Sequence, residues 1–389
     1  MNQIRSSDLV PRLMREFAYR TGLDPVGKAP RRYLWTDAFA VCNFLELHRQ
    51  TGEASWRELS LRLVNQVHHT LGRHRADDPR SGWISGLNET EGELHPTSGG
   101  LRIGKQENER RPGEPPDERR EWGRDGQYYH YLTKWMHALH RVSRVTGDRT
   151  YDKWALELAQ TTHERFSYRP SWGVAKRLYW KMSIDLSRPL VSSMGQHDPL
   201  DGLVTYSELQ AAAGQGTTSL PDLQAGITEL AVLCRDQEWG TDDPLGIGGL
   251  LFDASRVAQL TVAGCFGIGG LLEKVVDAAL AGLELYEEGT VLEPPAEHRL
   301  AFRELGLSIG LHSVRQLQSL VQDHSALFEQ KGSLPAGLAA LTGYLPIGER
   351  IESFWMDETN QRAASWTGHR EINMVMLATS LAPGGFIII

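Results

Sequence analysis

Cysteine is scarce in this chain, because its 389 residues include only Cys42, Cys234 and Cys265. An odd number of widely spaced cysteines matches neither a disulfide framework nor a zinc site. Each of the three lies in an apolar, helix-like stretch. We therefore expect three buried, reduced thiols, which are typical of a cytoplasmic protein.

Long hydrophobic runs and an excess of basic residues are also missing. No stretch reaches the roughly 18 apolar residues that a membrane-spanning helix needs, and the N-terminal segment lacks the apolar core of a secretion signal. The 41 Lys and Arg residues against 49 Asp and Glu give a net charge of -8. General binders of nucleic acids or membrane surfaces present a basic face. We expect a cytoplasmic protein that binds a small molecule, and neither nucleic acid nor membrane.

Sequence motifs for metals and common cofactors are absent. The chain contains no HExxH sequence, no CxxC pair and no phosphate-binding loop. The segment GIGG occurs at 246–249 and 267–270, but neither copy follows a recognisable strand, as a dinucleotide fingerprint would. The sequence thus requires neither a metal nor a cofactor.

What the sequence does contain is helical periodicity along almost its whole length. Apolar residues recur at helical spacing in twelve segments, and one stretch, 174–187, alternates in a way that favours a short β-strand or hairpin. The twelve predicted helices span residues 8–20, 33–51, 53–71, 126–147, 149–167, 203–214, 221–237, 247–264, 268–286, 297–312, 315–330 and 368–381.

An internal repeat indicates how these helices pair. Residues 51–53 and 146–148 both read Thr-Gly-acid between two helices, and Trp56 in one copy corresponds to Tyr151 in the other. A glycine in the left-handed conformation ends one helix, and a polar residue begins the next. Each copy therefore predicts an antiparallel helical hairpin.

The predicted connections alternate between short and long. Three are very long, at 72–125, 168–202 and 331–367, and part of the first, 102–124, is rich in charge and proline, which is typical of a mobile loop. Twelve helices joined in this way predict six hairpins closed in a ring, with helix 8–20 beside the last helix. The expected fold class is all-α, an (α/α)6 toroid, with residues 1–389 forming a single domain.

In this architecture the chain resembles the six-hairpin glycosidase superfamily, which includes N-acylglucosamine 2-epimerases and unsaturated glucuronyl hydrolases. The hairpin repeat and the helices RRYLWTDAFAVCNFLEL and DGQYYHYLTKWMHAL carry the resemblance, which covers most of the chain. It implies an active site on the face of the toroid where the inner helices begin. The long connections lead to the same face, and helix N-termini favour anions and polarised oxygens.

Residues near the start of an inner helix, or in the connection before it, are therefore the candidate site residues. We expect catalytic side chains among carboxylates and histidines that can exchange protons, and binding side chains among the aromatic and polar residues beside them. The catalytic candidates are Asp37, Asp125, His197, Asp198 and Glu371. The substrate-binding candidates are Trp35, Tyr128, His130, Trp180, Lys181, Gln196, His369 and Arg370.

Each candidate also has a purely structural interpretation. Asp125 precedes a predicted helix and is a natural helix cap, while an inward-facing Asp37 needs a partner such as Arg31 or Arg32. His130 is equally compatible with a hydrogen-bonded core histidine. His197 and Asp198 can form a turn before Pro199, which we expect to keep the segment out of the following helix.

Four functions are compatible with these residues. A glycoside hydrolase, our first hypothesis, needs two carboxylates on either side of the bond to be cleaved. A sugar epimerase or isomerase needs a base on each face of the reacting carbon, usually a pair of histidines, and His130, His197 and His369 are available for this role. A lyase or dehydratase acting on a less polar, isoprenoid-like substrate and a non-catalytic binding protein are the other two. The first two share a sugar-sized ligand.

Overall fold

The computed structural model of the chain describes residues 6–171, 176–214, 221–289, 291–328 and 332–389. These residues are mainly helical and divide into two compact units. Unit 2 is Ala18–Asp236, and unit 1 combines Met1–Phe17 with Gln237–Ile389. The organisation of residues 1–389 as a single domain stays a prediction.

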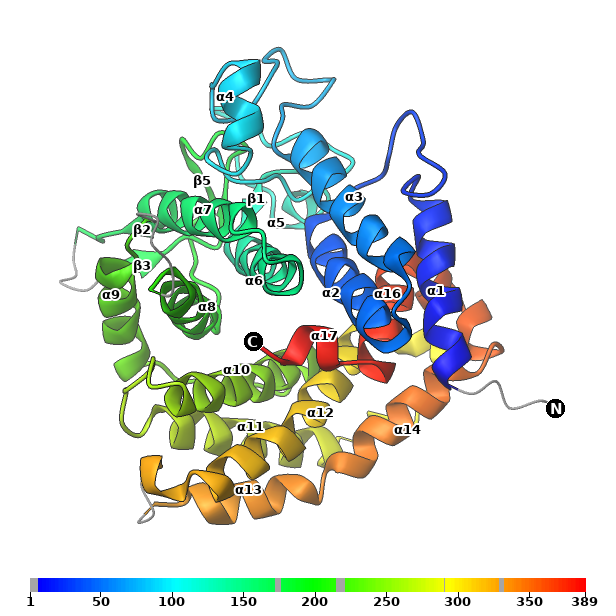
Figure 1. The fold of residues 1–389 in the computed structure, drawn as a ribbon, viewed down its shortest axis with the longest axis vertical. Helices are drawn as coiled ribbons and strands as arrows, with labels where there is room; N and C mark the ends of the chain where they lie inside the picture. Colours follow the sequence, from blue (N-terminus) through cyan, green and yellow to red (C-terminus); the bar gives the residue numbers. More distant parts are fainter. Residues whose placement is uncertain (1–5, 172–175, 215–220, 290, 329–331) are drawn as a thin grey trace. The chain divides into compact units, whose positions relative to one another are not determined.

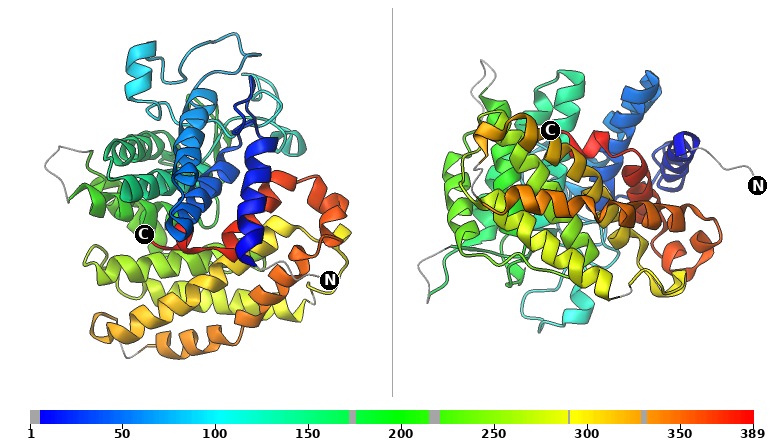
Figure 2. Two further views of the ribbon diagram at one scale, coloured as in Figure 1. Left: turned by 45° about the vertical axis from the view of Figure 1, so that its right-hand side comes forward. Right: turned by 90° about the horizontal axis from the view of Figure 1, so that it is seen from below.

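Three helical hairpins make up most of unit 2, as Figures 1 and 2 show. Within each hairpin the two helices pack side by side, and the first helices of successive hairpins also pack together, α2 on α6 and α6 on α8. The hairpins are α2 (Leu34–Thr51) with α3 (Ala54–Leu71), α6 (Tyr129–Thr146) with α7 (Thr150–Phe166), and α8 (Asp198–Ala213) with α9 (Gln224–Arg235).

The first helix of each hairpin is the more deeply buried one. In α2 every residue from Leu34 to Leu47 is buried, and in α8 every residue from Asp198 to Leu209 is buried. The partner helices α3 and α7 bury one face only. A helix that is buried all round has neighbours on every side, so α2, α6 and α8 are the inner helices of unit 2.

The two copies of the Thr-Gly-acid repeat have the same geometry. Gly52 (φ 73°) and Gly147 (φ 74°) are left-handed, and their amides donate to the carbonyls of His48 and Ser143 respectively. In each copy the threonine hydroxyl accepts a hydrogen bond of 3.2 Å from the amide two residues later. The predicted end of one helix and start of the next are thus confirmed at both turns.

The long connections of unit 2 contain short elements instead of open loop. They include α4 (Glu89–Leu94), α5 (Glu118–Glu121) and five strands of two or three residues: β1 (Gln127–Tyr128), β2 (Ser167–Tyr168), β3 (Arg177–Leu178), β4 (Lys181–Met182) and β5 (Pro189–Val191). Strand β4 lies between β1 and β5, antiparallel to both, and β2 pairs with β3. The strand or hairpin predicted at 174–187 therefore corresponds to β3 and β4, except that residues 174 and 175 lie outside the described residues.

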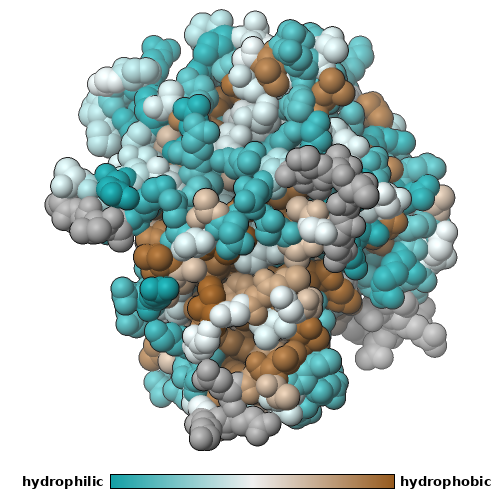
Figure 3. Space-filling model, turned by 60° about the vertical axis from the view of Figure 1, so that its left-hand side comes forward, coloured by the Kyte–Doolittle hydropathy of each residue, from teal (hydrophilic) through white to brown (hydrophobic). Residues whose placement is uncertain are grey.

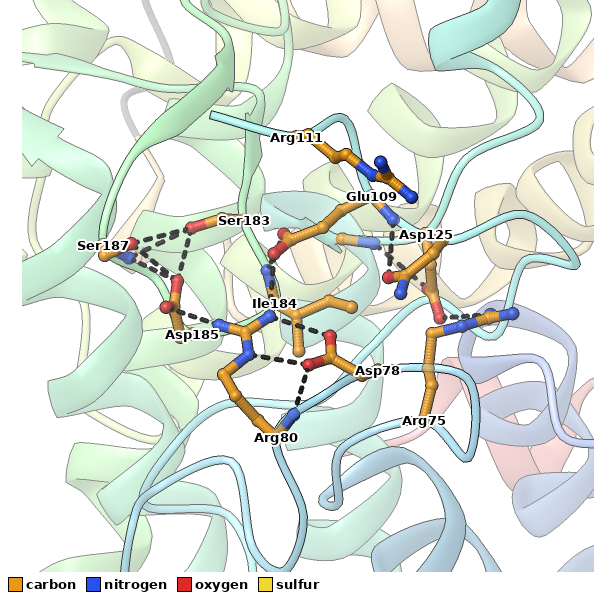
Figure 4. A network of polar contacts seen from close by, with 12 residues as sticks. Arg75, Asp78, Arg80, Glu109, Arg111, Asp125, Ser183, Ile184, Asp185 and Ser187 are labelled. Atoms are coloured by element: carbon orange, nitrogen blue, oxygen red, sulfur yellow. Dashed lines mark hydrogen bonds and ion pairs between the residues drawn. The ribbon is translucent and has the colours of Figure 1, made fainter. Parts of the chain in front are cut away.

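Arg80 ties three parts of these connections together (Figure 4). Its guanidinium contacts Asp78 and Glu109 at 2.9 Å and Asp185 at 2.7 Å. Glu109 also accepts a hydrogen bond from the amide of Ile184. Segment 102–124, predicted as a mobile loop, is thereby linked to the turn between β4 and β5.

Unit 1 is also built from packed helices. Its elements include α10 (Pro244–Val262), α11 (Leu271–Glu288), α12 (Ala301–Asp323), α13 (Leu334–Thr342), α14 (Leu345–Met356), α15 (Ala364–Thr367), α16 (Arg370–Leu381) and α17 (Gly384–Ile387), with 3-10 turns at Ala296–His298, Ser325–Leu327 and Asn360–Arg362. Helix α12 packs on α10, α14 and α16. Helix α1 (Ser6–Arg20) begins in this unit, where its Glu16 lies 3.9 Å from Arg370 at the start of α16.

The all-α fold class, with short strands in a long connection, is confirmed, but two details of unit 1 differ from the prediction. In place of the two helices expected at 297–312 and 315–330 there is one helix, α12, which ends at Asp323; residues 329 and 330 lie outside the described residues. The helix continues past residue 312 because no residue there breaks it, and the Ser313 hydroxyl is hydrogen-bonded to the carbonyls of Gly310 and Leu251. The connection expected at 331–367 contains α13 and α14, each of which has a proline in its first turn, where proline is tolerated.

Three further predictions were wrong. Helix α8 begins at Asp198, five residues earlier than predicted, because Pro199 occupies the first helical turn and does not end the helix. The predicted helix 126–147 begins at Tyr129, after strand β1. Cys42 and Cys234 are buried as expected, but Cys265 is exposed because it lies beyond the end of α10.

Hydrophobic side chains gather on part of the face drawn in Figure 3. Exposed apolar side chains are a normal feature of proteins, and the described examples include Tyr19, Trp122 and Leu285. Within the part of the chain that the structure describes, no helix has the length and apolar character needed to cross a membrane.

Gly202, in the first turns of α8, provides a test of this packing. A Cβ atom at Gly202 would lie 2.1 Å from the hydroxyl of Tyr129 on α6, whereas a Cβ at Gly249 in α10 would meet nothing within 4 Å. We expect Gly202→Ala to lower the free energy of unfolding by about 1–3 kcal/mol through overpacking. The matched variant Gly249→Ala should raise it by roughly 0.5–1 kcal/mol, because alanine favours a helix interior. Urea unfolding of both variants measures the difference, and equal effects would contradict the packing described here.

Candidate functional site

Backbone pairing in unit 2 brings three stretches of the chain to the start of α6. Strand β1 pairs with β4, so that Tyr128 lies opposite Lys181. The side chain of Gln127 donates to the carbonyls of Gly99 and Ile184 and accepts from the amide of Leu101. The amide of Tyr129 donates to the carbonyl of Trp180. Residues just before α6 and β4 are therefore held side by side.

Six rings gather at this point, and we call them the aromatic cluster. Trp180 lies 5.2 Å from Tyr128 and 6.1 Å from His130 between ring centroids, and its ring is nearly parallel to that of His130. The hydroxyls of Tyr33 and Tyr131 are 2.7 Å apart. The members of the cluster are Tyr33, Trp35, Tyr128, His130, Tyr131 and Trp180.

The cluster reaches the surface of the chain through some of its members. Trp35 and Tyr128 are buried, while Tyr33, Tyr131 and Trp180 are half-buried and 26% of the His130 side chain is exposed. Trp122, with 56% of its surface exposed, meets Trp180 edge to face at 5.2 Å. The cluster thus combines rings that are held in place by neighbouring rings with side chains that are partly exposed to solvent.

Asp198 is the acidic residue beside the cluster. Its Oδ1 lies 3.7 Å from Nδ1 of His130, and only 7% of its side chain is exposed. Its Oδ2 is buried without a hydrogen-bond partner in the described structure. A buried carboxyl oxygen without a partner is costly, so the protein leaves this polar atom unsatisfied at a cost in stability.

Gly195 makes room for the Asp198 carboxyl. A Cβ atom at position 195 would lie 2.4 Å from Oδ2 of Asp198. Helix α8 begins at Asp198 itself, so the carboxyl lies at the helix N-terminus. The segment before α8 thus allows the side chain to fold back against its own backbone.

The surroundings change the proton affinities of His130 and Asp198 in opposite senses. Burial raises the pKa of Asp198 to about 8, and the nearby Asp201 adds to this effect. Burial lowers the pKa of His130 to about 4. At neutral pH, Asp198 therefore carries a proton and His130 is neutral. A neighbouring acid and base whose pKa values are separated in this way are typical of proton-transfer sites.

The other acidic candidates in unit 2 have partners within the protein. Asp37 lies 3.4 Å from Arg32 and accepts a hydrogen bond from the amide of Tyr33, and burial raises its pKa to about 6. Asp125 is buried, with one oxygen near Arg102 and Arg75 and the other accepting from the amide of Gly104. Each of these two carboxylates thus has an arginine and a backbone amide of the protein as partners.

The remaining candidates are distributed over both units. Lys181 is buried and donates to the carbonyls of Glu121 and Arg124 beneath the Tyr128 ring, and burial lowers its pKa. His197 is the residue that precedes α8, and Gln196 is exposed. In unit 1, His369 packs edge to face on Phe302, Arg370 approaches Glu16, and Glu371 lies in the first turn of α16.

Two residues near His130, namely Tyr131 and Lys134, were not among the predicted site residues. Both are on α6 within four residues of His130. The spacing of Lys134, four residues after His130, could have indicated a shared helix face. In the part of the chain that the structure describes, no group of three or more His, Cys, Asp or Glu residues could hold a metal ion.

The raised pKa of Asp198 predicts a pH-dependent stability. Between its ordinary pKa of 3.8 and about 8, the folded protein keeps a proton that the unfolded chain releases. Raising the pH through this window therefore favours unfolding, by at most about 1.4 kcal/mol per pH unit. Asp198→Asn removes this contribution and should lose less stability than the wild-type protein from pH 5 to pH 8.

Urea unfolding at pH 5, 6.5 and 8 measures this difference, which we expect to reach at least about 1 kcal/mol over the range. Any contribution from His130 occurs in both proteins and largely cancels. Replacement of the exposed Asp242 by Asn is the matched control and should follow the wild-type pH dependence. Parallel curves for Asp198→Asn and the wild-type protein would show that Asp198 titrates normally.

Comparisons with known proteins show a similarity in fold. No family model matches the chain, and no curated protein sequence matches it. A sugar epimerase from a ruminal bacterium superposes with a TM-score of 0.43 at 9% identity, over 81% of this chain and 75% of that one. The cellobiose 2-epimerase from Spirochaeta thermophila DSM 6192 superposes with a TM-score of 0.44 at 12% identity, over 90% of this chain and 100% of that one. Both of these solved structures are sugar epimerases.

Proposed function

We propose that this protein is an enzyme that binds a sugar at the aromatic cluster and moves a proton with His130 and Asp198, as in a sugar epimerase or isomerase. The observation that carries the proposal is the approach of His130 Nδ1 to Asp198 Oδ1, 3.7 Å apart, beside Trp35, Tyr128 and Trp180. It joins a proton-transferring pair to a surface that suits a ring-shaped ligand.

The aromatic rings supply the binding surface. Sugar rings have an apolar face made of C–H groups, which packs on the faces of aromatic side chains, and hydroxyl groups that need polar partners. Here the rings of Trp180 and Tyr128 pack against His130, which lies 3.7 Å from the Asp198 carboxyl. Stacking on the rings and a hydrogen bond to Asp198 would together orient a monosaccharide unit.

Proton transfer follows from the protonation states. Neutral His130 can take the proton from the carbon next to the carbonyl group of an open-chain sugar, which breaks the C–H bond and forms an N–H bond. Asp198 can give its proton to the carbonyl oxygen, so that a neutral enediol is formed. Protonated His130 can then return the proton to the same carbon after the enediol has turned its other face, which yields the epimer, or to the neighbouring carbon, which yields the ketose. In both cases the ionised Asp198 takes back a proton from an enediol hydroxyl, so that both residues regain their starting states.

Glycoside hydrolysis, our first hypothesis from the sequence, is the second candidate. A carboxyl group that is protonated at neutral pH, as expected of Asp198, is suited to act as the general acid of a glycosidase. Hydrolysis also needs a second carboxylate, and Asp37 and Asp125 are both paired with arginines. The histidine beside Asp198 therefore favours proton transfer at carbon.

Exchange of a carbon-bound hydrogen tests this proposal directly. The protein is incubated in heavy water with free aldoses, N-acylated aldoses and reducing disaccharides, and NMR follows loss of the C2 proton signal and the products. We expect exchange with at least one sugar, and a decrease of at least about 100-fold in the variants His130→Gln and Asp198→Asn.

The exposed His298 provides a matched control, because His298→Gln should leave the exchange rate unchanged. Release of the second sugar unit without C2 exchange would favour hydrolysis instead. Exchange that persists in both His130→Gln and Asp198→Asn would contradict the assigned roles.

The pH dependence of kcat/KM should follow the two pKa values. Activity requires neutral His130, so it should decrease below about pH 4, and protonated Asp198, so it should decrease above about pH 8. We therefore expect a broad bell-shaped profile in an exchange assay between pH 3.5 and 9.5. An activity that still increases above pH 8 would show that Asp198 acts in its ionised form.

A further inference from the structure

A second polar pair lies between α6 and α8, one helical turn beyond His130 and Asp198. Lys134 follows His130 by four residues on α6, and Asp201 follows Asp198 by three on α8. The Nζ atom of Lys134 is 2.6 Å from Oδ1 of Asp201. Because the two helices pack together, the spacing places the two pairs one above the other along the same contact.

The second pair is nearly shielded from water and is tied to the backbone of His130. Lys134 has 11% of its side chain exposed and Asp201 has 7%. The hydroxyl of Thr133 lies 2.5 Å from Oδ2 of Asp201 and 3.0 Å from the carbonyl oxygen of His130. A buried ion pair is weak evidence for a gain in stability, because desolvation offsets the attraction. A gain in stability is therefore not a sufficient explanation for the Lys134–Asp201 pair.

We propose that Lys134 and Asp201 are positioning residues for His130 and Asp198: the Asp201 carboxylate keeps the proton on Asp198, and Lys134 limits how strongly it does so. This inference rests on the proposed function of His130 and Asp198. Like charges close together in a buried site oppose the ionisation of one another. Asp201 is held as a carboxylate by Lys134, so Asp198 is the member that stays protonated.

The groups that face Asp198 and His130 support this assignment. On α8, Asp198 is faced by Asp201, and on α6 by His130, Lys134 and Tyr129. The rings packed against His130 from α2, β1 and the segment before β4 are uncharged: Trp35, Tyr128 and Trp180. Among these described neighbours, Asp201 and Lys134 are the charged groups that can set the proton equilibrium of the pair.

The test uses two variants that should have opposite effects. Asp201→Asn removes the negative charge, so Asp198 should ionise at a lower pH, by of the order of one pH unit. Lys134→Met leaves the Asp201 charge uncompensated, so Asp198 should ionise at a higher pH. A purely structural role would give both variants the same effect or none. Asp242→Asn removes an exposed carboxylate of unit 1 and is the control, which should leave the titration of Asp198 unchanged.

Selective labelling and NMR measure the ionisation of Asp198 and His130 in the full-length protein without any sugar, with Asp198→Asn and His130→Gln used to assign the signals. Circular dichroism confirms that each variant is folded, and if Lys134→Met does not fold, Asp201→Asn decides alone. The alkaline limb of the exchange activity should move in the same direction as the NMR titration of Asp198.

Failure of this inference and failure of the proposed function can be told apart. If Asp198 titrates at the wild-type pH in Asp201→Asn, or if both variants shift it in the same direction, the positioning role is wrong. If the titration shifts as expected but no sugar exchanges a proton, the positioning role holds and the proposed chemistry is wrong.

Discussion

The burial of α2, α6 and α8 on all sides is the constraint on which unit 2 depends. A polar group on such a helix is cut off from water and needs a partner from the protein itself. Asp37 has Arg32, Asp201 has Lys134, and Glu208 has His137, at 2.9 Å. Asp198 differs from these residues, because its buried Oδ2 has no such partner in the described structure. The other oxygen of the same carboxyl lies 3.7 Å from His130 of the aromatic cluster.

The long connections of unit 2 hold Trp180 and Tyr128 next to each other. Trp180 immediately precedes strand β4, and the pairing of β4 with β1 places its ring against Tyr128, just before α6. Arg80 links Asp78, Glu109 and Asp185, and so joins the long connection before β1 to the turn that follows β4 (Figure 4). The ion pairs of these segments thus contribute to the site by holding a hairpin of short strands, which would not be stable alone.

Much of the fold could be predicted from particular residues. Gly52 and Gly147 indicated two hairpin turns because few other residues adopt the left-handed conformation easily. Trp35, Tyr128, His130, Trp180 and Asp198 were each predicted as site residues and lie together in unit 2. The break expected near residue 313 and the late start of α8 were wrong, since Ser313 and Pro199 have positions in which a helix tolerates them. Local propensity is a weak guide where tertiary contacts supply the missing hydrogen bonds.

The sequence by itself determined the helical class, the hairpin turns and the residue types available for chemistry, because helical periodicity and glycine turns depend on near neighbours in the chain. Only the tertiary structure decided which of the candidate carboxyls lies beside a histidine and which lie beside arginines. Asp37, Asp125 and Asp198 are chemically alike in the sequence, but arginines contact the first two, whereas a histidine and a second aspartate lie near the third. The proton affinity of a carboxyl depends on burial and nearby charge, and both come from segments far apart in the chain.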